Sequence, residues 1–238
     1  MKKTVYILSV LSVVFTLTCQ GQFLKDAKKL LQQNTGGGFT EEEAASGIRE
    51  ALIKGTGNGV DIVSKVDGYF KNPEIKIPFP PEAKEIENKL RAVGLGNKVD
   101  DVVLSINRAA EDAAVEAKNI FIAAIKNMTI REAINIVRGE KDAATQYLKR
   151  NTTNELTLKF RPIIETSLEK VDATKYWDDV IITYNKIPFV KKMNPDLAEY
   201  VTDKAIEGLF VMIAREEEKI RKDPAARTTE ILRKVFGG

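Results

Sequence analysis

Apolar residues recur at every third or fourth position along most of the chain, which is the spacing of a helix with one buried face. The pattern is most regular between Asn97 and Met128, so this stretch is expected to form the longest helix. Strand-like alternation is confined to Ile75-Lys76-Ile77, which is too short to anchor a sheet. The pattern therefore predicts an all-α fold.

Glycines and prolines divide this pattern into about nine or ten helices of unequal length, a compact single-domain array rather than a regular four-helix bundle. The glycines of residues 55–59 are expected to break a helix, and Pro162 to kink or break another. The expected helices cover residues 41–54, about 60–66, 81–93, 97–128, 130–139, 142–150, 152–171, 174–187, 195–222 and 228–236.

Capping residues support several of these helix starts. Thr40 with Glu43, and Thr129 with Glu132, have the spacing of a capping box, in which each side chain bonds to the other residue's backbone N–H. Asp142 is expected to cap the helix that follows it.

One irregular, proline-rich segment interrupts the array between Asp67 and Pro81. Its aromatic and aliphatic residues are too numerous for a solvated loop. Two interpretations remain open: the segment folds down over the core, or it is a lid or edge offered to a partner. The apolar positions are Tyr69, Phe70, Ile75, Ile77 and Phe79.

The N-terminus has the pattern of an export signal. Two lysines precede an uncharged apolar run from Thr4 to Thr18, which is too short for a comfortable membrane span. Residues 1–21 are therefore expected to be a signal peptide cleaved after Gly21, which predicts a periplasmic protein. The alternative is a lipoprotein, with Cys19 lipidated and retained as a membrane anchor.

The remaining chain is expected to comprise an N-terminal helix with a Gly-rich linker over residues 22–38 and a helical domain over residues 39–238. The net charge is +3, and removal of residues 1–21, which hold two Lys and no acid, leaves +1. This balance does not suggest nucleic acid as a partner. No second apolar run reaches about 18 residues, so no transmembrane span is expected in the mature chain.

Composition removes several chemistries. The chain has no His and one Cys, which excludes Ser-His-Asp and Cys-His catalysis, His- or Cys-built metal sites, and internal disulfides. Neither a calcium-loop nor a phosphate-loop motif is present. The sequence therefore predicts no metal and no cofactor.

Three groups of residues are candidate sites. Asn107, Arg108 and Glu111 lie together inside the longest predicted helix, with Arg108 expected to pair with Asp112. They are either a polar pocket for a small ligand or hydrogen bonds that fix the packing of neighbouring segments.

The second group is aromatic: Tyr147 and Tyr200, with Trp177 and Tyr184, either line a ligand cavity or close the core. The third is the charged stretch 215–222, expected to be a solvated helix face.

Several separated blocks together resemble a family of exported bacterial proteins known only as a domain of unknown function, whose members are often described as candidate lipoproteins. The resemblance covers about residues 23–237 and implies a mostly helical envelope protein, but no reaction and no site residues. The blocks are 66–72, 75–80, 106–111, 142–147, 200–205, 208–210 and 219–229.

The function expected from the sequence is that of a non-catalytic envelope protein that binds a partner protein or an apolar small molecule. The absence of His and of a catalytic Cys favours this over an enzyme. The alternatives are an enzyme that uses carboxylate acid–base chemistry around Glu111, and a purely structural envelope protein.

Overall fold

The computed structural model describes residues 40–170, 177–178, 181–182, 184–186, 188–189, 192–194 and 196–223. Residues Glu41–Gly238 form one compact unit, and Met1–Thr40 form another, of which Thr40 alone is described. Three predicted segments lie outside the described residues: the signal peptide, the N-terminal helix with its Gly-rich linker over 22–38, and the helix over 228–236. Half of the residues of the helix predicted over 174–187 also lie outside them.

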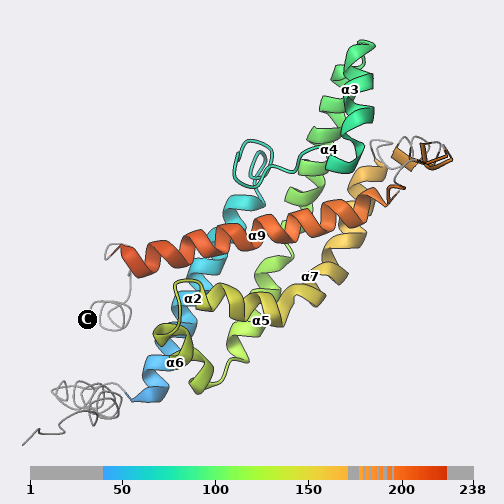
Figure 1. Cartoon of the computed structure of the whole chain (residues 1–238). Coiled ribbons are helices and arrows are strands. Elements are labelled where there is room, and N and C mark those ends of the chain that lie inside the picture. The colour runs from blue at the N-terminus through green and yellow to red at the C-terminus, as the bar shows by residue number, and fades with distance from the viewer. Residues whose placement is uncertain are drawn as a thin grey trace, which may run out of the picture. The chain divides into compact units, whose positions relative to one another are not determined.

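The described residues form helices and connecting segments without strands, which confirms the all-α prediction (Figure 1). The predicted number of helices was wrong: the described residues hold fewer than nine or ten. In chain order they are α2 (Glu41–Val63), the short 3-10 helix η1 (Pro81–Ala83), α3 (Lys84–Ala92), α4 (Gly96–Ala114), α5 (Ala117–Lys126), α6 (Ile130–Arg138), α7 (Ala143–Glu169) and α9 (Leu197–Lys222).

Helices are fewer because two expected interruptions do not end a helix. Helix α2 runs unbroken through Gly55 and Gly59, both of which are buried against α9. A Cβ atom on Gly59 would lie 2.7 Å from Ile213 Cδ1, and one on Gly55 would lie 3.1 Å from Ile220 Cδ1. These glycines therefore let two helices approach closely instead of ending one.

Helix α7 likewise continues through Asn151, so the helices predicted over 142–150 and 152–171 form one helix of 27 residues, which also contains Pro162. The helix bends along its length (Figure 1), as expected where proline removes a backbone donor.

The helix predicted over 97–128 is not continuous. It divides into α4 and α5 at Val115 and Glu116, where the Glu116 N–H donates to Ala113 O at 3.1 Å, a tighter turn than that of an α-helix.

Helices α4 and α9 organise the core. Helix α9 crosses the molecule and packs against α2, α4 and α7, and α4 also packs against α7 (Figure 1). The four alanines of α4 and the first alanine of α5 are fully buried, so neighbouring elements can approach α4 closely. They are Ala109, Ala110, Ala113, Ala114 and Ala117.

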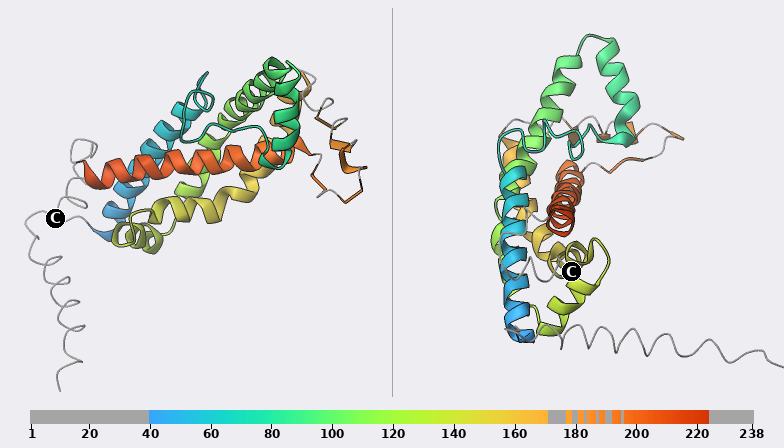
Figure 2. Two further views of the ribbon diagram at one scale, coloured as in Figure 1. Left: turned by 45° about the horizontal axis from the view of Figure 1, so that its top comes forward. Right: turned by 90° about the vertical axis from the view of Figure 1, so that its left-hand side faces the viewer.

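The proline-rich segment folds down over the core, as one of the two interpretations had it. Tyr69, Ile75, Ile77 and Phe79 are buried. Phe79 meets Trp177 edge to face, with ring centroids 5.4 Å apart. Beyond this segment, α3 and the first half of α4 project from the rest of the unit as a helical hairpin (Figure 2).

Candidate functional site

Asn107 holds the proline-rich segment through the backbone of Ile77. Its Oδ1 accepts a hydrogen bond from Ile77 N at 2.9 Å, and its Nδ2 donates to Ile77 O at 2.7 Å and to Val103 O at 2.7 Å. The Asn107 side chain is fully buried. The amide therefore satisfies both backbone groups of an extended residue, as a neighbouring strand would.

Glu111 lies one turn further along α4 and binds the beginning of the same segment. Its Oε1 accepts from Tyr69 N at 3.0 Å and from Phe70 N at 3.1 Å. Its Oε2 accepts from Arg108 Nη1 at 2.6 Å. Both oxygens of this buried carboxylate are thus engaged by donors within the protein.

Arg108 links Glu111 to Asp67, where the irregular segment begins. Arg108 Nη2 donates to Asp67 Oδ1 at 2.6 Å, and Lys71 Nζ lies 2.7 Å from Asp67 Oδ2. The hydrogen bonds from Lys71 and then Arg108 hold the pKa of Asp67 below its ordinary value of 3.8. The expected pair with Asp112 is absent from the described residues, because Arg108 turns toward the segment, and Asp112 accepts from Ser167 Oγ instead.

Two tyrosines complete the attachment of this segment. The buried Tyr69 hydroxyl donates to Ala205 O on α9 at 2.6 Å, and burial, followed by the nearby Glu111 charge, raises the pKa of Tyr69. Its ring requires Gly208, because a Cβ there would lie 2.8 Å from Tyr69 Cε1. Tyr200 donates to Pro78 O at 3.2 Å, and burial raises its pKa to about 12.

Four of the five candidate binding residues therefore act on one segment. Asn107, Arg108, Glu111 and Tyr200 all contact residues 67–78, and their hydrogen bonds stay within the protein. This geometry favours the interpretation in which these residues fix packing.

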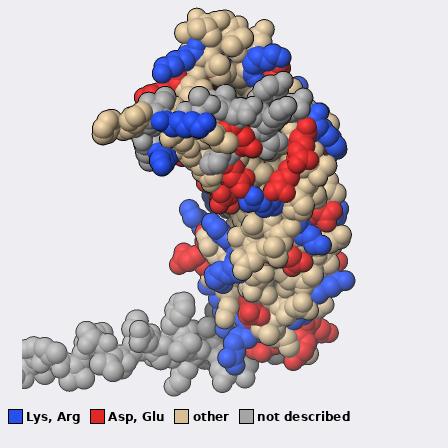
Figure 3. All heavy atoms as spheres, turned by 90° about the vertical axis from the view of Figure 1, so that its right-hand side faces the viewer, with Lys and Arg blue, Asp and Glu red and all other residues tan. Residues whose placement is uncertain are grey.

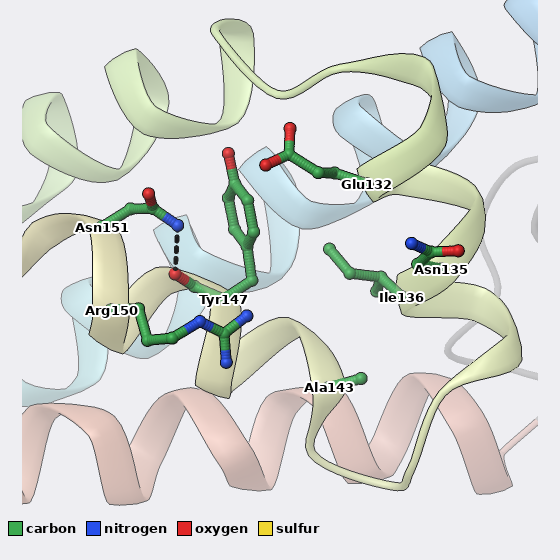
Figure 4. A pocket seen from close by; sticks show the side chains of 7 residues that line it. All are labelled: Glu132, Asn135, Ile136, Ala143, Tyr147, Arg150 and Asn151. Atoms are coloured by element: carbon green, nitrogen blue, oxygen red, sulfur yellow. Dashed lines mark hydrogen bonds between the residues drawn. The ribbon is translucent and has the colours of Figure 1, made fainter.

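Tyr147 lies elsewhere, in a hollow of about 410 Å³ between α6 and the first turns of α7 (Figure 4). Its hydroxyl donates to Ala124 O at 3.3 Å. Burial raises the pKa of Tyr147, and the Glu132 charge adds to this. The lining residues are Glu132, Asn135, Ile136, Ala143, Tyr147, Arg150 and Asn151.

The hollow has opposite charges on its two walls. Glu132 lies on α6, where its Oε2 accepts from Thr129 N at 2.8 Å and Thr129 Oγ1 at 2.7 Å; these hydrogen bonds lower its pKa. This is the predicted capping box, and it is confirmed. Arg150 lies on α7, exposed, and forms no hydrogen bond or ion pair with any described residue. The neighbouring Asn151 donates through Nδ2 to Tyr147 O at 2.7 Å (Figure 4).

The sequence did not single out Glu132, Asn135, Arg150 or Asn151 as site residues. Each is a polar residue on a helix, indistinguishable by spacing from ordinary solvated positions. Arg150 and Asn151 follow Tyr147 by three and four residues on α7, so helical spacing places them beside it. The packing of α6 beside α7 adds Glu132 and Asn135. The sequence offers only a weak signal for this site, namely that Arg150 and Asn151 closely follow the candidate Tyr147 and that Asn135 precedes it.

Glu217 corrects two predictions. Residues 215–222 were expected to be solvated, but Glu217 is buried and binds the start of α7. Its carboxylate accepts from Ala144 N at 3.0 Å, Thr145 N at 2.8 Å and Thr145 Oγ1 at 2.8 Å. Asp142 stands at the cap position without a side-chain capping bond, so a carboxylate from α9 replaces it. Arg221 Nη2 also lies 2.8 Å from Glu217 Oε1.

Among the residues that the structure describes, no group of three or more Cys, Asp or Glu is placed to hold a metal ion. None of the helices described is both long and apolar enough to cross a membrane. The lipidation candidate Cys19 lies outside the described residues.

The fold and these contacts define a class of all-helical domain in which one central helix holds an irregular segment through buried polar side chains. The chain belongs to the family described as "Protein of unknown function (DUF4197)", whose model matches residues 38–237. The resemblance to a domain of unknown function is thereby confirmed. Comparisons with curated proteins and with solved structures gave no match to this chain.

Proposed function

We propose that this chain is an exported, non-catalytic binding protein, and that the hollow between α6 and α7 takes a small molecule bearing both a carboxylate and an amino group. The proposal rests on the Arg150 guanidinium, which has no hydrogen-bond or ion-pair partner among the described residues, at one wall of a hollow of 410 Å³, with the Glu132 carboxylate at the other. A hollow of this volume falls within the range of small-molecule sites.

The charges of Arg150 and Glu132 indicate which class of ligand the hollow would bind. A guanidinium binds a carboxylate through two parallel hydrogen bonds, and Arg150 has no competing partner among the described residues. Glu132 uses Oε2 for its cap, and no described residue donates to its Oε1, which can therefore accept from an ammonium group. The Tyr147 ring lies between these two side chains (Figure 4) and offers an apolar surface to the body of the ligand. An amino acid or a dipeptide has this combination of groups.

This ligand class differs from the apolar small molecule expected from the sequence. Four of the seven lining residues are charged or carry an amide, and a purely apolar ligand would offer no partner to the Arg150 guanidinium or to Glu132 Oε1. The alternative of acid–base catalysis at Glu111 has less support. That carboxylate is 3% exposed and already accepts three hydrogen bonds, so a substrate would have to displace the segment it holds.

Export and location remain part of the proposal. They are supported by the signal pattern of residues 1–21, with its lysines, apolar run and small residues at the cleavage position. The protein is then either released into the periplasm of a bacterial envelope after cleavage at Gly21, or anchored there through a lipid on Cys19.

The test is a thermal-shift screen of the chain against free amino acids and dipeptides, followed by calorimetry on the compounds that raise Tm. Arg150→Gln should weaken binding by roughly tenfold to a hundredfold, because it removes a charged hydrogen bond. Glu132→Gln keeps the capping box and should weaken binding of the amino group. Arg138→Gln, an exposed arginine outside the lining, is the matched control. A panel without any binder, or equal affinity in Arg150→Gln and Arg138→Gln, would overturn the proposal.

A further inference from the structure

The turn between α3 and α4 has a defined and rigid backbone. Leu95 N donates to Leu90 O at 2.9 Å, and Gly94 N donates to Arg91 O at 3.2 Å, which is the pattern of a Schellman helix end. Gly94 has a φ of +83°, a conformation that glycine adopts without strain. The apex of the hairpin is therefore Val93-Gly94-Leu95-Gly96, and this segment is called the tip below.

The tip presents apolar side chains to solvent. Val93 is 71% exposed and Leu95 is 46% exposed. They stand at the end of the projecting hairpin, away from the packed helices (Figure 2). Further down, Ile86 and Leu90 of α3 are half-buried against the core, so the hairpin is attached through its lower part.

Basic residues surround the tip, and acidic residues are absent from its immediate sequence. Lys89 and Lys98 are exposed and form no ion pair with any described residue, and no acid lies within residues 88–99. Arg91 joins α3 to α4: its Nε lies 2.9 Å from Glu87 Oε1, and its Nη2 lies 2.8 Å from Asp100 Oδ1. Figure 3 shows the uncharged end of the molecule, with basic side chains on either side below it.

We infer that the tip docks on an anionic lipid surface, with Val93 and Leu95 entering the interfacial region and Lys89 and Lys98 binding headgroup phosphates. Shallow apolar insertion combined with attraction to anionic lipids is how peripheral proteins bind membranes without spanning them. The inference concerns a surface separate from the α6–α7 hollow and does not depend on the proposed function.

The small apolar area of the tip and the positive charges beside it favour a lipid surface over a protein partner. Two apolar side chains at a turn form a smaller patch than the several hundred Å² typical of protein contacts. The cations lie at the level of the hairpin just below these side chains, where headgroups would meet them. The positive end of the α4 dipole adds to this field, because the first turn of α4 holds no acidic residue.

The test reports on the tip itself, in the full chain after its own processing. Cys19→Ser leaves an added cysteine as the only labelling position. Asn97→Cys places an environment-sensitive fluorophore beside the tip, and Asn154→Cys places it on an exposed position of α7 as the matched control. The probes are vesicles of phosphatidylcholine alone, and of phosphatidylcholine mixed with phosphatidylglycerol.

The label at position 97 is expected to brighten and shift to the blue with the mixed vesicles, to respond little to phosphatidylcholine alone, and to lose its response at high salt. The label at position 154 should not change. No response at position 97, an equal response to both vesicle types, or an equal response at both positions would each overturn the inference.

Two variants in the Asn97→Cys chain separate the contributions. Lys89→Gln with Lys98→Gln, and Val93→Ser with Leu95→Ser, should each raise the lipid concentration for half-maximal response roughly tenfold. The controls on α7 are Lys149→Gln with Lys159→Gln, and Leu158→Ser, all at exposed positions. Tip variants that respond like their controls would contradict the assignment.

Discussion

In this protein, single polar side chains form the hydrogen bonds to backbone groups that secondary structure usually supplies. Asn107 pairs with both backbone groups of Ile77, and Glu111 accepts from two consecutive backbone N–H groups, at Tyr69 and Phe70. An irregular segment without strand partners can therefore lie against the core without leaving its backbone groups unsatisfied. The stability of the segment depends on a few residues of α4.

Asn107→Ala tests this dependence. The substitution leaves Ile77 N and Ile77 O without partners at a buried site, so it should lower the free energy of unfolding by about 2–4 kcal/mol. Asn88→Ala, at an exposed position of α3, should change it by less than about 0.5 kcal/mol. Urea denaturation of the two variants beside the wild type measures the difference, and equal losses would show that the amide is not needed.

Asp67 predicts a pH dependence. Its folded-state pKa lies below the unfolded value of about 3.9, so its ion pairs stabilise the protein above that value and cease to do so as pH falls through the folded-state pKa. Asp67→Asn keeps a residue that tolerates the positive φ of 70° at this position. Denaturation at neutral and acidic pH should show a smaller acid loss for Asp67→Asn than for wild type. The exposed Asp101→Asn control should follow the wild type, and parallel curves for all three would contradict the assignment.

The candidate site was predicted in part at this scale. The grouping of Asn107, Arg108 and Glu111 follows from helical spacing. That spacing does not reveal the backbone groups, 30 to 42 residues away, that Asn107 and Glu111 bind. Arg108 shows the limit clearly: the local partner Asp112 was expected, and the distant Asp67 binds it. Arg150 lies beside Tyr147 through helical spacing on α7, but Glu132 of α6 becomes their neighbour only through tertiary packing.

At the scale of elements, helix ends and helix contacts depend on residues from other helices. The start of α7 is bound by Glu217 of α9, and α2 reaches α9 through Gly55 and Gly59. Sequence patterns predicted where most helices lie, because apolar spacing is local. They misread Gly55 and Gly59 as a helix break, because burial against a neighbouring helix, which the local pattern does not show, decides whether such glycines end a helix. At Pro162 a kink or a break was predicted, and the helix continues with a bend (Figure 1).

Gly59→Ala and Gly57→Ala should have opposite effects. Alanine normally stabilises a helix interior by about 0.5–1 kcal/mol relative to glycine, and a Cβ on Gly57 would meet only Lys118 Cε, at 3.9 Å. On Gly59 the Cβ would lie 2.7 Å from the buried Ile213 Cδ1, so overpacking should lower stability by about 1–3 kcal/mol. Thermal unfolding measures both. A Tm that rises in both variants would show that α2 and α9 do not approach this closely.

Glu217→Gln tests the cap supplied by α9. The neutral amide loses the charge that binds the α7 N-terminus and Arg221, and its NH₂ group cannot accept, so stability should fall by about 2–4 kcal/mol. Glu218→Gln, which changes the adjacent and more exposed carboxylate, should cost less than about 1 kcal/mol. Chemical denaturation distinguishes them, and similar losses would mean that Glu217 has no special role.

At the scale of the compact unit, the helices leave two features that the packing does not explain. One is the hollow between α6 and α7, at whose wall Arg150 has no partner among the residues that the structure describes. The other is the projecting hairpin with its apolar tip. The all-α class was predictable from the sequence because strand patterns are nearly absent. The hollow was not, because it exists only where two helices, each ordinary in sequence, lie side by side.

The central claim is that the α6–α7 hollow binds a small molecule through Arg150, and native mass spectrometry tests it most directly. The chain, gently purified and then mixed with the panel of amino acids and dipeptides, is predicted to carry a small non-covalent mass. The Arg138→Gln control should keep that mass, and Arg150→Gln should lose it. A chain that stays bare both as purified and with the panel, or a mass that persists in Arg150→Gln, would contradict the account.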